Sequence, residues 1–153
     1  MTVHEGELGR DDVRALLALH FAEMHADSPP EACHVLPIDA LGTPNIRLLT
    51  MRDSGGHLLG VGALKIIDGD HGEIKSMRTA TEALGRGIGR QMLAHLIALA
   101  RDAGMRRISL ETGNSPLFQA ANRLYLSASF SRCEPFGDYA ESPFTHFYTL
   151  ALS

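Results

Sequence analysis

The sequence has no surplus of basic residues, very little cysteine and no long hydrophobic run. Its 14 Lys and Arg stand against 18 Asp and Glu, which gives a formal net charge of −4 and disfavours a nucleic-acid-binding surface. Cys33 and Cys133 are the two cysteines, too few to frame a secreted domain with disulfides. The longest apolar stretch, around Met92–Ala100, is interrupted by His95 and is too short to cross a membrane.

Targeting signals and linkers are also missing. Residues 1–10 contain acids and lack the apolar stretch of a signal peptide. No repeat, low-complexity run or Gly/Ser linker divides the 153 residues, of which 44% are hydrophobic. We therefore expect one domain over residues 1–153, located in the cytoplasm and bound to neither membrane nor nucleic acid.

Apolar residues that recur every three or four positions predict three helices, over Asp11–His25, about Gly87–Ala103 and a segment starting at Ser115. Either Asp11 or Asp12 is suited to cap the first helix, and Ser115 is suited to cap the third. The buried side of the third helix is predicted to comprise Leu117, Ala120, Ala121, Leu124 and Ala128.

Six segments have the composition of strands: 46–52, 57–67, 73–78, 107–111, 131–136 and 145–152. The first three follow one another through glycine-containing turns and predict an antiparallel meander. The order of helices and strands predicts a mixed α/β (α+β) sheet. The segment 27–45 holds four prolines and no periodicity, so it is either a plain surface loop or a substrate loop.

The most distinctive local pattern is Leu84-Gly85-Arg86-Gly87-Ile88-Gly89-Arg90, between a predicted strand and a predicted helix. Glycines allow close approach of the backbone to a ligand, and the free N–H groups of a helix start attract phosphate. Walker A loops are excluded because no Gly-Lys pair occurs, and the G-x-G-x-x-G fingerprint fails because Arg90 or Met92 replaces its third glycine. The alternative is a turn that merely connects two elements.

Together with this turn, several strings resemble the GNAT superfamily of acyl-CoA-dependent N-acetyltransferases, and most closely its YsnE-type bacterial branch. The matching segments are 28–31, 62–65, 73–79, 87–89, 110–113, 122–125, Phe130 and 135–139. The resemblance covers nearly the whole chain. It implies a central, mostly antiparallel twisted sheet with flanking helices, and acetyl-CoA as the acyl donor.

The resemblance also implies which residues would bind acetyl-CoA. Backbone amides over Leu84–Arg90 would hold its pyrophosphate, and the backbones of Met77 and Thr79 would hold the pantetheine arm. Asn122 would lie near the pantetheine, and Tyr125 near the thioester sulfur.

Two positions depart from the family pattern. Leu84 stands where the superfamily usually has Arg or Gln, and the basic residue is instead Arg86, so the anion site would depend more on amides and less on that side chain. Ser129 stands before Phe130 where the family tends to have glycine. We interpret this replacement as a local loss of backbone stability at a helix end, without functional meaning.

Acetyl transfer to an amine requires a base, because an alkyl ammonium must lose its proton before it attacks. Position and resemblance indicate Glu73 as this base, with Glu111 as the second candidate. Tyr125 is the candidate general acid, since a phenol is protonated at neutral pH and can protonate the leaving thiolate. The alternatives are an exposed acid at Glu73 and an ordinary core tyrosine at Tyr125.

The eight histidines form no H-E-x-x-H motif and no Cys/His cluster with zinc spacing, so we expect no metal. A lone histidine is usually structural, but His34 lies in the proline-rich segment and is a candidate for the acceptor pocket. An acyl-enzyme on Cys33 has no readable base beside it.

The sequence therefore predicts an enzyme that moves an acetyl group from acetyl-CoA to a primary amine of a small molecule or peptide, by direct attack in a ternary complex. The alternative is a catalytically inactive module that senses acetyl-CoA. Segments 27–45 and 136–143 are expected to select the acceptor, and the acids Glu31, Asp39, Asp138 and Glu141 within them would suit a cationic amine. A homodimer is left open by the resemblance.

Overall fold

The computed structural model describes residues 1–152, except for the side chain of Glu31. Its strands are β1 (Thr2–Glu5), β2 (Ile46–Arg52), β3 (Leu58–Asp68), β4 (His71–Thr79), β5 (Arg107–Gly113), β6 (Ser131–Arg132) and β7 (Thr145–Ala151). Its helices are α1 (Asp11–Asp27), α2 (Ile88–Asp102) and α3 (Gln119–Ser127). Short 3-10 turns occur at Pro30–Ala32, Ile38–Gly42, Thr81–Ala83 and Pro116–Phe118.

The strands form one sheet in the order β1-β2-β3-β4-β5-β7-β6. Every neighbouring pair is antiparallel except β4 and β5, which are parallel. The predicted meander and mixed α/β sheet are thus confirmed. The sequence pattern missed β1, because this short edge strand has only one partly buried side chain, that of Val3.

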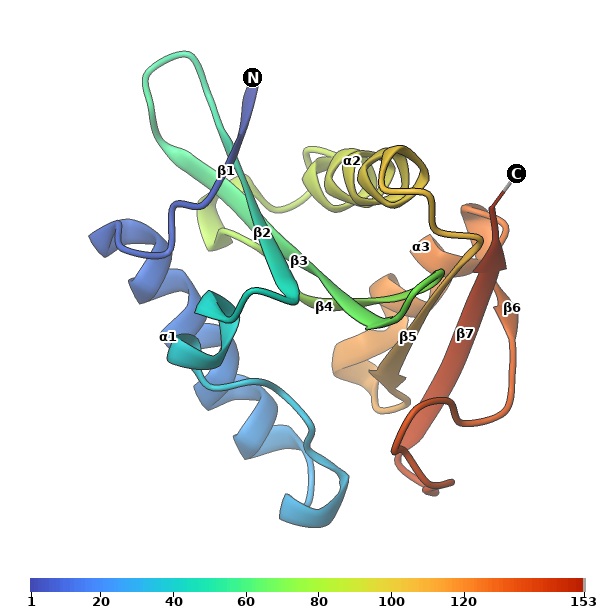
Figure 1. Ribbon diagram of the computed structural model, residues 1–153. Helices are drawn as coiled ribbons and strands as arrows, with labels where there is room; N and C mark the ends of the chain where they lie inside the picture. The colour runs from blue at the N-terminus through green and yellow to red at the C-terminus, as the bar shows by residue number, and fades with distance from the viewer. Residues whose placement is uncertain (153) are drawn as a thin grey trace.

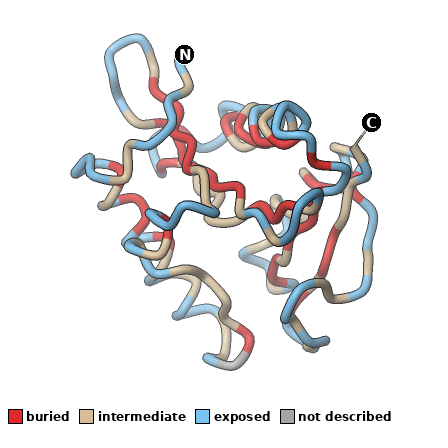
Figure 2. The backbone as a smooth tube through the Cα atoms, in the orientation of Figure 1, coloured by how far each residue is buried: buried red, intermediate tan, exposed pale blue. Residues whose placement is uncertain are grey.

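Helices α1 and α2 both pack against β3 and β4, and they lie on opposite sides of these strands (Figure 1). Figure 2 shows buried residues along the central strands and on one side of α2. Leu64 of β3 and Leu96 of α2 have no exposed surface. A Cβ at Gly62 would lie 2.9 Å from side-chain atoms of Leu96 and Met92, so glycine permits this close approach of helix to sheet.

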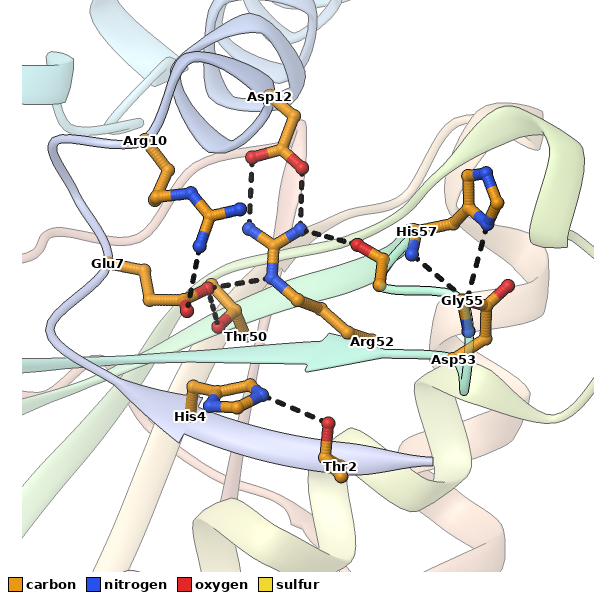
Figure 3. Close-up of polar contacts among 11 residues, drawn as sticks. Thr2, His4, Glu7, Arg10, Asp12, Thr50, Arg52, Asp53, Gly55 and His57 are labelled. Carbon is orange, nitrogen blue, oxygen red and sulfur yellow. Dashed lines mark hydrogen bonds and ion pairs between the residues drawn. The ribbon is translucent and has the colours of Figure 1, made fainter.

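The start of α1 differs from its prediction. Arg10 is the N-cap and no side chain caps the helix. Asp12 instead receives two hydrogen bonds from Arg52, at 2.6 and 2.9 Å (Figure 3). The Arg52 side chain also donates to Glu7 Oε1 at 2.9 Å and to the Gly56 carbonyl at 3.0 Å. Arg52 is almost fully buried, so its carboxylate partners are what makes burial of a guanidinium tolerable.

The third helix also begins later than predicted. Pro116–Phe118 forms a 3-10 turn before α3, and the Ser115 hydroxyl donates to Asp27 Oδ2 at 2.7 Å instead of capping the helix. Leu117 is 51% exposed, whereas Tyr125 is the buried residue of α3. Ala120 is exposed as well. The predicted buried stripe was therefore wrong at Leu117 and Ala120, and it omitted Tyr125. The predicted strand 131–136 was too long, since β6 ends at Arg132.

Within the part of the chain that the structure describes, none of the helices has the length and hydrophobicity needed to cross a bilayer.

Candidate active site

The sheet opens between its two parallel strands. β4 and β5 pair only from His71 and Arg107 to Glu73 and Ser109, and beyond this point the strands diverge (Figure 1). The pairing of β4 with β3 is interrupted in the same region, and Ser76 has a positive φ of 56°. This β-bulge bends β4, so its last residues separate from β5.

A cleft of about 530 Å³ occupies this opening. Its walls come from β4, β5, α1, α3 and residues 32–35. Four of the residues singled out from the sequence line it with their side chains or backbone: Glu73, Glu111, Tyr125 and His34. Met77, Thr79 and Leu84 line it as well, so the structure brings half of the predicted site residues into one cavity, whereas residues 85–90 and Asn122 do not line it.

The glycine-rich turn leads directly into α2. Gly85 and Gly87 have positive φ values of 77° and 76°, and Gly87 is the N-cap of the helix. Space beside both glycines is open, because a Cβ at either position would meet no heavy atom within 4 Å. The first N–H groups of a helix have no acceptor within the helix, so this turn offers donors and a positive dipole end to an anion.

The side chains around the turn divide into two kinds. Arg86 and Arg90 are exposed, and neither forms an ion pair with any described carboxylate. Ile88 is buried in the core and anchors the helix start. A Cβ at Gly89 would lie 3.5 Å from the side chain of Leu124, so the turn packs against α3, which forms one wall of the cleft.

Glu73 is buried at the point where β4 and β5 separate. Its Oε2 accepts a hydrogen bond from the Tyr139 hydroxyl at 2.5 Å and one from Lys75 Nζ at 3.2 Å. Lys75 also donates to the Tyr139 oxygen at 2.7 Å. Burial, and next the charge of Glu73, raises the pKa of Tyr139 well above its usual value, so this phenol remains a hydrogen-bond donor. Glu73 is thus a buried carboxylate, not the exposed acid of the alternative interpretation.

Glu111 lies on β5 and forms a close pair with His34. The Nδ1 atom of His34 is 2.8 Å from both carboxylate oxygens. Burial raises the pKa of Glu111, and its hydrogen bond with His34 acts in the opposite direction. The Tyr139 ring lies against the imidazole, with ring centroids 5.0 Å apart. The structure therefore joins residues 77 positions apart into a carboxylate–imidazole pair at the cleft.

Tyr125 lines the cleft from α3 while its ring packs against Phe130 and Tyr148, at centroid distances of 6.0 and 5.9 Å. Burial, with a smaller effect of Tyr148, raises the pKa of Tyr125 to about 12. The phenol therefore keeps its proton throughout the neutral range. Its hydroxyl makes no hydrogen bond to any described residue.

Asn122 has a different environment from the one expected. Its Nδ2 donates to the carbonyls of Gly113 and Phe118, at 3.0 and 2.8 Å, and its Oδ1 accepts from the Tyr148 hydroxyl at 2.7 Å. It is not among the residues that line the cleft. In this structure Asn122 joins α3 to β5 and β7, so any effect on a ligand is through the position of α3.

Sequence reasoning missed two residues of the site, Lys75 and Tyr139. Both lie in strings that match the family, but neither has a pattern that separates it from an ordinary strand or loop residue. A lysine inside a predicted strand, between Ile74 and Ser76, was the available signal for Lys75. For Tyr139, only the folded chain places its hydroxyl beside Glu73, a residue 66 positions away.

Across the described residues, no group of three or more His, Cys, Asp and Glu side chains is arranged to hold a metal ion.

A mostly antiparallel sheet that opens between two parallel strands, beside a glycine-rich helix start, is the acyl-CoA N-acyltransferase fold. Residues 11–130 match the model of the Acetyltransferase (GNAT) family. The chain belongs to this family and is an acetyltransferase.

Relatives and solved structures agree with this assignment. The chain is 41% identical to the uncharacterized N-acetyltransferase YedL of Escherichia coli, covering 99% of this chain and 94% of the relative. It is also 41% identical to the uncharacterized N-acetyltransferase YsnE of Bacillus subtilis, covering 99% and 100%. A GNAT family acetyltransferase from Elizabethkingia anophelis, solved with acetyl-CoA bound, is 22% identical, with a TM-score of 0.73 over 99% of this chain and 97% of that one. The resemblance to the YsnE-type branch is thereby confirmed.

Proposed function

We propose that this protein transfers the acetyl group of acetyl-CoA to a primary amine of a small molecule or peptide, by direct attack in a ternary complex. The observation that carries the proposal is one cleft that holds the buried Glu73, the largely buried Glu111 and a protonated Tyr125, with Leu84 of the glycine-rich turn among its lining residues. The bound acetyl-CoA of the Elizabethkingia homologue supports the choice of donor.

The residues at the turn fit the donor. The amides of Gly85–Arg90 would hold the pyrophosphate, because they surround open space at a helix start. The exposed guanidinium groups of Arg86 and Arg90 supply positive charge at the same place, which compensates for Leu84 in the usual basic position. Backbone groups of Met77 and Thr79, on the part of β4 that has left β5, would hold the pantetheine arm.

Acetyl transfer then requires two proton movements. The amine nitrogen forms a bond to the thioester carbonyl carbon and gives a proton to a base, and the carbon–sulfur bond breaks. The cleft offers two acceptors for this proton, Glu73 and the His34–Glu111 pair. Tyr125 would give its proton to the departing thiolate, and solvent would restore it.

Two free cysteines, Cys33 and Cys133, are compatible with a reducing compartment. We therefore also propose a cytoplasmic location, which detection of the tagged protein in fractionated cells would test.

The proposal is tested by incubating the protein with acetyl-CoA and a panel of primary amines while free thiol is measured. We expect release of CoA and formation of an acetylated amine with at least one member of the panel. Calorimetry with acetyl-CoA supplies the control for binding. A protein that binds acetyl-CoA but acetylates no amine would instead be the sensing module.

A further inference from the structure

The cleft contains a histidine, His34, whose imidazole is oriented by a carboxylate, as the imidazole of a general base commonly is. His34 Nδ1 lies 2.8 Å from both oxygens of Glu111, whose carboxylate is largely buried. An ionised carboxylate only accepts hydrogen bonds, so opposite an ionised Glu111 the neutral ring carries its hydrogen on Nδ1 and Nε2 retains its lone pair. Nε2 has no hydrogen-bond partner among the residues of the described chain, and 34% of the side chain is exposed.

Glu73 is placed less favourably for taking a proton. Its Oε2 already accepts hydrogen bonds from Tyr139 and Lys75, and the side chain of Lys75 is itself only 9% exposed. Protonation of Glu73 would leave the buried ammonium of Lys75 without its counter-charge, which is costly. The network of Glu73, Lys75 and Tyr139 is therefore suited to hold Tyr139 against the imidazole, with which its ring is in contact.

We infer that His34 is the catalytic base of this acetyltransferase and that Glu111 is its positioning residue, an inference that rests on the proposed function. His34 Nε2 takes the proton of the amine as the carbon–nitrogen bond forms, and the imidazolium stays paired with Glu111. After the thiolate has received the Tyr125 proton, His34 releases its own proton to solvent. The titratable groups facing the pair are Tyr139, Glu73 and Lys75, with Cys33 next in the chain.

The tautomer of His34 provides a test that needs no substrate. Nitrogen-15 NMR of histidine-labelled protein, with His34→Gln used for assignment, separates a protonated Nδ1 from a protonated Nε2. We expect the neutral ring to carry its hydrogen on Nδ1, and a hydrogen on Nε2 would overturn the inference because no lone pair would then face the amine.

Kinetics provide the second test, on an amine that the wild-type protein acetylates. His34→Gln should lower kcat by about 100-fold or more with unchanged affinity for acetyl-CoA in calorimetry. Glu111→Gln should lower kcat less and move the acid limb of the kcat/KM profile to lower pH, since the imidazolium loses its counter-charge. His57→Gln, at an exposed histidine in the β2–β3 turn, is the matched control and should leave activity unchanged.

The outcomes separate the two proposals. A folded His34→Gln variant as active as wild type, or a loss confined to Glu73→Gln, overturns only the assignment of the base. Wild-type protein that binds acetyl-CoA without acetylating any amine overturns the proposed function itself.

Discussion

The Tyr139 hydroxyl donates a 2.5 Å hydrogen bond to Glu73 Oε2, and this contact joins the segment between β6 and β7 to the point where the sheet opens. It brings a carboxylate, a lysine and an aromatic ring together at one side of the cleft. The segment 136–143, expected to select the acceptor, is thereby attached to the candidate catalytic residues.

Tyr139→Phe should therefore affect activity as well as stability. Loss of one buried hydrogen bond costs about 1 kcal/mol in the free energy of unfolding, measured in urea. We expect an additional drop of about tenfold in kcat/KM for the amine, because the Tyr139 ring loses the hydrogen bond that holds it against the His34 imidazole. Thr50→Val is the control: it removes a hydrogen bond to Glu7 at a buried residue that does not line the cleft, and it should lower stability by a similar amount with little change in kcat/KM. Equal kinetic effects of the two variants would contradict a role for Tyr139 at the site.

Tyr125→Phe should lower kcat by about 100-fold while acetyl-CoA affinity stays unchanged in calorimetry. With a pKa of about 12, Tyr125 is protonated on both sides of neutrality, so the wild-type rate should not decline between pH 7 and 10 through loss of this proton. The measurement is kcat as a function of pH for both proteins. Wild-type kcat in the variant would exclude Tyr125 as the acid.

Gly87→Ala should weaken acetyl-CoA binding. Alanine at a φ of 76° costs about 1 kcal/mol in stability, and relief of this strain would rotate the amides at the helix start. We expect a rise of about tenfold in the Kd for acetyl-CoA by calorimetry. Gly104→Ala, at the other end of α2 with a φ of 81° and equally open surroundings, should lose the same stability and retain wild-type affinity. If both variants bind alike, the turn is only a connection.

Arg52→Met should destabilise the protein by about 3 kcal/mol, because it leaves the carboxylates of Asp12 and Glu7 without their buried partner. The control is Arg47→Met, which breaks an exposed ion pair with Glu5 and should cost less than about 1 kcal/mol. Urea unfolding of the three proteins measures both differences. A similar cost at the two positions would show that burial of Arg52 has no energetic consequence.

His20 should make stability depend on pH. Burial, and next the charge of Arg78, lowers the pKa of this histidine to about 4 from 6.5, although Glu23 opposes the shift. Between these two values the unfolded chain binds a proton that the folded chain does not, so stability falls as pH decreases. Between pH 7 and pH 5 we expect a loss of about 2 kcal/mol from this residue.

The His20→Leu variant isolates this effect, since it removes the titrating group and fills the same buried position of α1 with an apolar side chain. Urea unfolding at pH 7, 6 and 5 should show a smaller loss for the variant than for wild type. Parallel stability curves would exclude His20 as the source.

Much of the architecture follows from local pattern. Apolar residues that recur every three or four positions identified all three helices, and the glycine-containing turns identified the meander of β2, β3 and β4. The turn at Leu84–Arg90 was recognisable from its glycines, because few other residues adopt the positive φ that this helix start requires. Leu117 and Tyr125 were misjudged because the helix begins only at Gln119, and a shift of three residues changes which side chains face the core.

The composition of the site depends on contacts between distant parts of the chain. By itself the sequence determined the order of the helices and of every strand except β1, the family and the candidates Glu73, Glu111, Tyr125 and His34, because propensity, periodicity and motif are local properties. Only the tertiary structure decided that Glu111 pairs with His34 and that Glu73 pairs with Lys75 and Tyr139. Those pairings arise where the bulge at Ser76 separates β4 from β5, and the environment that determines how a carboxylate binds protons is created only by that folding.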